Sequence, residues 1–145
     1  MTVIAYDGKT ISADKRATSG GLIRTVTKLH KLSDGSIFAH CGDSARGLEM
    51  LEWLKAGSDI EKFPADQRHD DKWGSCIWLK PDGLFVYEMT PHPLKFEDKC
   101  LAFGSGREFA LAAMHCGKTS AEAVEIASLF DNGCGNGIDT MSLEG

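Results

Sequence analysis

Alternating apolar and polar positions, interrupted by turn residues, dominate the first 42 positions of the chain. Residues 2–6 and 9–13 flank Asp7-Gly8, a turn signal, which predicts a β-hairpin at the N-terminus. Residues 25–32 alternate in the same way and are followed, after a Ser-Asp-Gly turn, by the extended apolar segment 36–42. The pattern therefore predicts two consecutive hairpins.

A helical spacing replaces the alternation after this point. The leucines between positions 48 and 54 are spaced by three, Asp43 or Ser44 can cap the helix before them, and Gly57 marks its end. We expect this helix to cover one face of a sheet. Residues 57–72 are polar without an apolar stripe, which predicts a loop with at most one short helical turn.

The second half of the chain contains a further hairpin, then helices and a last strand. The pattern predicts strands over 75–80, 84–89 and 100–103, helices over 106–116 and 119–130, and a strand over 138–143. Thr119 to Glu122 forms a capping-box pattern at the start of the second of these helices. Segregated strands and helices favour two antiparallel sheets with helices outside. A length of 145 residues predicts one domain, 1–145.

Composition excludes several classes of protein. A formal net charge of -5, with scattered Lys and Arg, argues against nucleic-acid binding. The N-terminus has neither the basic start nor the long apolar run of a signal peptide. No stretch of the sequence is apolar enough to span a membrane. Five widely spaced cysteines without a C-x-x-C pair indicate reduced thiols, and the histidines lack zinc-ligand spacing. We therefore expect a cytoplasmic protein with neither metal nor cofactor.

Thr2 is the first candidate for chemistry. It follows Met1, and a small second residue is the usual condition for removal of an initiator methionine. Removal would leave a threonine with a free α-amino group, which titrates at about 7.7 to 8.0 and can act as a base for its own hydroxyl. From position alone, a polar residue at a frayed terminus is the simpler interpretation.

Hairpin register brings further residues toward Thr2. A three-residue loop after Tyr6 would place Asp14 opposite Thr2, whereas a two-residue loop would move Asp14 to the other face. A three-residue loop in the second hairpin would place Lys28 across from His40 and diagonal to Gly42.

Each of these residues also has a structural interpretation. A lysine paired with a carboxylate beside Thr2 would favour its ionised hydroxyl, and a glycine N–H could hold an oxyanion. Alternatively, Asp14 is a strand-end turn residue, Lys28 a solvated strand charge, and Gly42 the residue before a helix cap.

Six ordered segments resemble one family. The start Met1–Tyr6 resembles a Met-Thr-Thr-Ile start, and the other matching segments are Ser12–Thr18, Thr27–Leu32, Cys41–Ala45, Phe103–Gly106, and Phe130-Asp131 with Gly137–Asp139. Together they resemble the proteasome β-subunit family, including the bacterial peptidase HslV and short proteasome-like subunits of bacteria and phages. Gly104-Ser105-Gly106 does not continue as a dinucleotide-binding G-x-G-x-x-G pattern, so no nucleotide site is predicted.

The resemblance implies an α+β fold, the four-layer αββα sandwich of Ntn hydrolases. It also implies these roles: Thr2 as nucleophile and base, Asp14 and Lys28 as an ion pair that tunes it, Gly42 as oxyanion donor, and Ser105 with Asp131 as the groups that orient the amine. His40 would lie at the floor of the pocket that receives the side chain preceding the cut bond. Alternatively, because strand residues alternate, His40 points to the other face of the sheet.

The resemblance further implies a threonine endopeptidase in a self-compartmentalised homo-oligomer, a ring or double ring. Its substrate would be unfolded polypeptide delivered by an ATP-dependent unfoldase, with no nucleic-acid or membrane partner. Two alternatives stay open. Val3 replaces a second threonine and Cys134 replaces a serine that helps hold the amine, which favours a catalytically impaired structural or assembly protein. A small-amide Ntn amidohydrolase would use the same residues without a ring.

Overall fold

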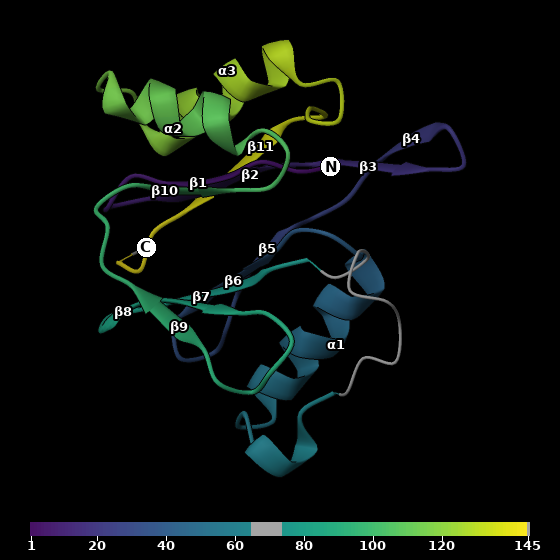
Figure 1. Cartoon of the computed structure of the whole chain (residues 1–145), viewed down its shortest axis with the longest axis vertical. Coiled ribbons are helices and arrows are strands. Elements are labelled where there is room, and N and C mark those ends of the chain that lie inside the picture. The colour runs from purple at the N-terminus through teal and green to yellow at the C-terminus, as the bar shows by residue number, and fades with distance from the viewer. Residues whose placement is uncertain (65–73, 145) are drawn as a thin grey trace.

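The computed structural model describes residues 1–64 and 74–144, which form two stacked antiparallel sheets with helices on their outer faces (Figure 1). The first sheet has the order β10-β1-β2-β11, with strands Leu101–Phe103, Ile4–Tyr6, Ile11–Asp14 and Ile138–Met141. The second has the order β5-β6-β7-β8-β9, with strands Leu29–Lys31, Ile37–His40, Cys76–Lys80, Gly83–Tyr87 and Leu94–Phe96.

Helices cover the outside of both sheets. α2 (Arg107–His115) and α3 (Ser120–Phe130) lie on the first sheet, and α1 (Ser44–Lys55) lies on the second (Figure 1). A short 3-10 helix, η1 (Ile60–Lys62), follows α1. The expected four-layer αββα arrangement is confirmed.

Strand alternation divides the core into three layers. Side chains such as Ile4, Ile11 and Ile37 pack between the two sheets. Val3 and Ala5 face the other way and pack under α2 and α3. Phe38 likewise faces α1, because successive strand residues point to opposite faces. Each sheet is therefore buried on both sides.

The first hairpin does not have the three-residue loop that would place Asp14 opposite Thr2. Asp7 N–H donates to Thr10 O at 3.1 Å, Tyr6 pairs with Ile11, and Asp14 pairs with Val3, as in the alternative with a two-residue loop. The Asp7 carboxylate accepts from the backbone N–H groups of residues 9 and 10 at 2.8 and 2.7 Å and so stabilises this turn. The expectation of a three-residue loop is therefore wrong.

The second hairpin has the expected register, because Leu32 N–H donates to Ser36 O at 2.8 Å. The strand before it is shorter than expected. Residues 22–25 instead form β4 (Leu22–Thr25), which pairs with β3 (Arg16–Ser19) in a ribbon that projects beyond the sheets (Figure 1). The sequence analysis missed this ribbon, although its turn is a Gly-Gly pair with φ of +56° and +80°. Strand β9 was missed as well.

Helix α1 has the predicted cap and most of the predicted buried face. The Asp43 carboxylate accepts from Ala45 N–H at 2.9 Å. Leu51 and Leu54 are buried as predicted, together with Met50, whereas Leu48 is 52% exposed. The predicted short turn in 57–72 corresponds to η1, and residues 65–72 lie outside the described residues. No described helix is both long and apolar enough to cross a membrane.

Candidate active site

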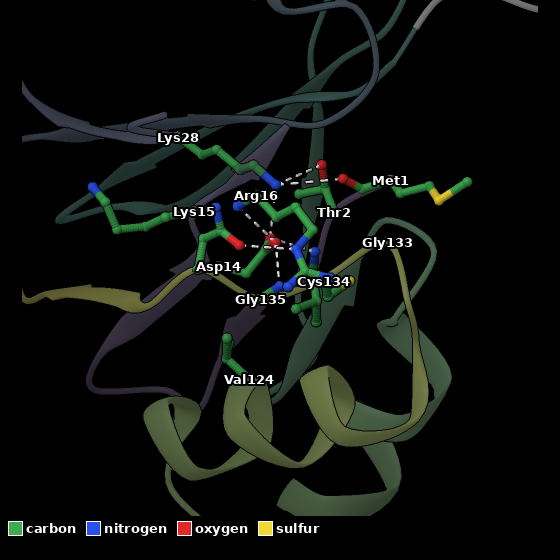
Figure 2. A network of polar contacts seen from close by, with 12 residues as sticks. Met1, Thr2, Asp14, Lys15, Arg16, Lys28, Val124, Gly133, Cys134 and Gly135 are labelled. Carbon is green, nitrogen blue, oxygen red and sulfur yellow. Dashed lines mark hydrogen bonds and ion pairs between the residues drawn. The ribbon is translucent and has the colours of Figure 1, made fainter. Parts of the chain in front are cut away.

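Lys28 is the centre of a buried polar cluster beneath the N-terminus. Its Nζ donates to Asp14 Oδ1 at 2.8 Å and to Thr2 Oγ1 at 3.2 Å, and also contacts the Met1 carbonyl at 3.4 Å (Figure 2). Relative exposure is 4% for Lys28, 0% for Asp14 and 5% for Thr2. Lys28 lies just before β5, so strand alternation does not fix its direction and it reaches across to the first sheet. The cluster therefore joins the two sheets.

The Asp14 carboxylate is held by four donors. Besides Lys28, Oδ1 accepts from Val3 N–H at 3.0 Å, and Oδ2 accepts from Arg16 N–H at 3.2 Å and Gly135 N–H at 3.1 Å. The changed register brings Val3 N–H to this carboxylate. The sequence analysis did not identify Gly135, which carries no functional group beyond its backbone. Backbone N–H groups thus hold the Asp14 carboxylate in place to pair with Lys28.

Ser105 contacts the backbone of Thr2. Thr2 N–H donates to Ser105 Oγ at 3.2 Å. A hydrogen bond with the Ser105 hydroxyl is the largest cause of a lowered pKa at Asp131, whose Oδ1 also accepts from Gly133 N–H at 2.8 Å. Gly104 has φ of +93°, and a Cβ there would lie 2.2 Å from Thr2 O. Glycine is therefore required for Ser105 to approach Thr2 this closely.

Cys134 lies beside this contact. Its Sγ is 3.9 Å from Ser105 Oγ and the residue is 1% exposed. Burial, reinforced by the nearby charge of Asp14, raises the pKa of the thiol to about 12. A protonated thiol is a weak hydrogen-bond partner, so it restrains Ser105 less than a hydroxyl would.

A cavity of about 670 Å³ opens at Thr2. Gly42 and Ser105 line it, so the structure brings both of these predicted residues to the same space as Thr2. Glu88 and Arg107 line it as well. The sequence analysis missed these two, because nothing in the pattern relates the end of β8 to the start of α2. Met1 and Thr2 themselves line this cavity.

Comparison with known proteins accounts for this arrangement. No family model matches the chain. The chain is 25% identical over 175 residues to Proteasome subunit beta 2 of Pyrococcus abyssi (strain GE5 / Orsay), covering 97% of this chain and 84% of that protein. The chain is thus similar to a proteasome β-type subunit over nearly its whole length.

Solved structures show the same fold as this chain. The Thiobacillus denitrificans BPH in complex with Epoxomicin superimposes with a TM-score of 0.72, 19% identity and 99% coverage of each chain. The eukaryotic HslV from Trypanosoma brucei gives a TM-score of 0.71, 19% identity and 97% coverage of each chain. The αββα sandwich is the Ntn-hydrolase fold.

His40 does not line the cavity at Thr2, which corrects the expectation that it forms the pocket floor. Its ring faces α1 from β6, and a Cβ on Gly47 would lie 2.4 Å from the ring. The ring of His30 stacks beside it, with centroids 6.4 Å apart. Strand alternation explains the outcome, because His40 shares the face of Phe38. The adjacent Cys41 and Gly42 line the cavity instead.

The buried position of His40 predicts a pH-dependent loss of stability. Burial, then the charges of His30 and Lys28, lowers the pKa of His40 from 6.5 to about 4. The unfolded chain therefore binds more protons between these values, and stability falls as pH decreases from about 6.5 to 4. His40→Gln should remove on the order of 2 to 3 kcal/mol of that decrease. Urea unfolding at several pH values checks it, and equal pH slopes for both proteins would contradict it.

Among residues 1–64 and 74–144, no group of three or more His, Cys, Asp or Glu side chains could hold a metal ion. The chemistry open to the described cluster is that of its threonine, its ion pair and its backbone N–H groups.

Proposed function

We propose that this chain is a threonine-type peptidase subunit in which Thr2 becomes the nucleophile after removal of Met1. The observation that carries the proposal is the double contact of Lys28, whose Nζ reaches Thr2 Oγ1 and Asp14 Oδ1 in a buried cluster. A lysine held by a buried carboxylate places a fixed positive charge next to the hydroxyl. That charge stabilises the oxygen as it loses its proton.

The proposed reaction uses groups of this cluster, the backbone of Gly42 and one water molecule. The free Thr2 amine takes the proton from Oγ1, which attacks the carbonyl carbon of a peptide bond. The tetrahedral oxyanion collapses to an ester on Oγ1, and the departing amine takes the proton. Water then hydrolyses the ester. Gly42, which lines the cavity, is the proposed N–H donor to the oxyanion.

Ser105 and Asp131 are proposed to orient the Thr2 amine. Thr2 N lies 3.2 Å from Ser105 Oγ, and the same hydroxyl interacts with the Asp131 carboxylate. A free amine in this position would be held through the same oxygen. Its lone pair could then face Oγ1 instead of solvent.

The family supports an assembled protease. We propose a homo-oligomer, a ring or double ring, that acts on unfolded polypeptide and is supplied by an ATP-dependent unfoldase. The support is the likeness to a proteasome subunit and to HslV. A monomer of full activity on a small amide would instead favour an Ntn amidohydrolase.

Intact-mass spectrometry combined with a peptidase assay tests the proposal. We expect fluorogenic-peptide hydrolysis to scale with the fraction of chains that lack Met1, because only a free Thr2 amine can act as the base. Epoxomicin, seen in complex with the Thiobacillus denitrificans BPH, is the matching probe and should block the same fraction. Hydrolysis that is independent of Met1 removal would exclude this mechanism.

Cys134 favours one alternative, a subunit with impaired turnover. Its protonated thiol lies 3.9 Å from Ser105 Oγ and gives weak support to the residue that holds the amine. We expect Cys134→Ser to raise kcat by roughly threefold to tenfold, because a hydroxyl bond is stronger than a thiol contact by about 1 kcal/mol.

The matched control is Cys116→Ser. Cys116 is exposed at the end of α2, so its replacement should leave kcat unchanged. Equal kcat values for the parent and both variants would show that Cys134 does not limit turnover.

A further inference from the structure

Two charged side chains line the cavity at Thr2 and have no part in the proposed chemistry. Glu88 directly follows β8 of the second sheet, and Arg107 is the first residue of α2 on the first sheet. They therefore approach the cavity from different layers of the sandwich. No ion pair between them occurs within 4.0 Å in the described part of the chain. Each charge is left to face the cavity.

Arg107 is held at the rim of the cavity. Its Nη1 donates to Gly104 O at 3.0 Å, next to the Ser105 that contacts Thr2. Its nearest carboxylate, Glu108, is 3.9 Å away with a side chain that is 86% exposed. An exposed pair at this distance neutralises little charge. The start of α2 adds positive character to the same side of the cavity.

Glu88 is exposed and, among residues 1–64 and 74–144, has neither a hydrogen bond nor an ion pair. It lines a second cavity of about 330 Å³ together with Met89 and His92. Glu88 and Met89 line both spaces, so the two cavities are neighbours with Glu88 between them.

We propose that Glu88 and Arg107 select polypeptide substrates by the order of basic and acidic side chains around the cut bond. A basic side chain on one side of the cut bond contacts Glu88, and an acidic side chain on the other side contacts Arg107. This inference rests on the proposed function, because it assigns the substrate preference of the same site. Opposite charges that come from the two different sheets would give the cavity a polarity that a peptide with exchanged charges does not match.

Two quenched fluorescent peptides of identical composition test the proposal. One carries Lys before and Glu after a central apolar pair, and the other has the two charges exchanged. We expect their kcat/KM values to differ roughly tenfold, mostly through KM, since two exposed charge pairs change sign between the peptides. Glu88→Gln and Arg107→Gln should each reduce the difference to about threefold.

Charge exchange in the protein gives the sharper result. The double variant Glu88→Lys with Arg107→Glu should prefer the other peptide, whereas Glu125→Lys, at an exposed position of α3, should keep the parent preference. Circular dichroism checks that each variant is folded. Equal kcat/KM for the two peptides in the parent, or an unchanged preference in the double variant, would overturn the proposal.

A binding measurement tests this charge preference independently of the proposed peptidase activity. Fluorescence anisotropy with labelled forms of both peptides is measured on the Thr2→Ala variant, which needs no turnover. If the two peptides bind unequally, and the charge-exchanged variant reverses the order, the proposed charge preference is supported. This holds even if the parent protein cleaves neither peptide. Absence of cleavage would reject only the proposed peptidase activity. Cleavage of both peptides with equal binding would leave the peptidase and reject the polarity.

Discussion

Thr2→Ala is expected to reduce peptide hydrolysis by on the order of a thousandfold or more, because it removes the only hydroxyl in contact with Lys28 Nζ among the described residues. Alanine is small enough to preserve removal of Met1, so the variant still carries a free amine. The expected loss therefore lies in kcat. Steady-state kinetics with a fluorogenic peptide measures it.

Thr2→Ser is the matched variant, since it keeps the hydroxyl and loses only the methyl group. It should retain measurable turnover, while both variants keep the parent circular dichroism spectrum. Intact mass must confirm the same state of Met1 in all three proteins. Turnover of Thr2→Ala at the level of Thr2→Ser would place the nucleophile elsewhere.

The second large effect is expected at the buried ion pair. Lys28→Met leaves the Asp14 carboxylate with backbone donors alone, and removal of one partner of a buried pair costs about 3 to 5 kcal/mol of stability. Asp14→Asn leaves Lys28 without its anion. Each change should lower kcat/KM by orders of magnitude, and the double variant should lose little more, because the pair acts as one unit.

The chain offers a control for this experiment. Lys15 Nζ and Asp139 Oδ2 are also 2.8 Å apart, but their side chains are 22% and 31% exposed. Lys15→Met should therefore cost about 1 kcal/mol or less and leave turnover near the parent value. Urea unfolding and peptide kinetics on the four variants make the comparison. Similar costs at the two pairs, or additive losses at Asp14 and Lys28, would show that burial gives Lys28 no special role.

The sequence predicted much of the fold because its signals were local. Period-two alternation, the Asp43 cap and the Thr119–Glu122 capping box each act within a few residues, and all three appear in the structure. The first hairpin was missed by one position, because the Asp7 side chain competes for the backbone N–H groups of its own turn. Loop length cannot be read from Asp-Gly alone.

The sequence predicted one contact of the candidate site and missed others. Lys28 contacts Asp14 as expected, although the predicted register of the first hairpin was wrong. The second hairpin has the predicted register, but His40 faces α1 instead of the cavity. Glu88 and Arg107 could not be predicted, since their common cavity depends on how the two sheets stack.

The Gly135 N–H that binds Asp14 has a consequence for the newly made chain. Donor and acceptor are 121 residues apart, and Lys28 reaches Asp14 from the other sheet. Asp14 is synthesised well before Gly135, so the carboxylate gains its full set of donors only after residue 135 has been made. Under the proposed function, a partly synthesised chain would have its nucleophile without this electrostatic support. The proposed peptidase would then become active only when folding is nearly complete.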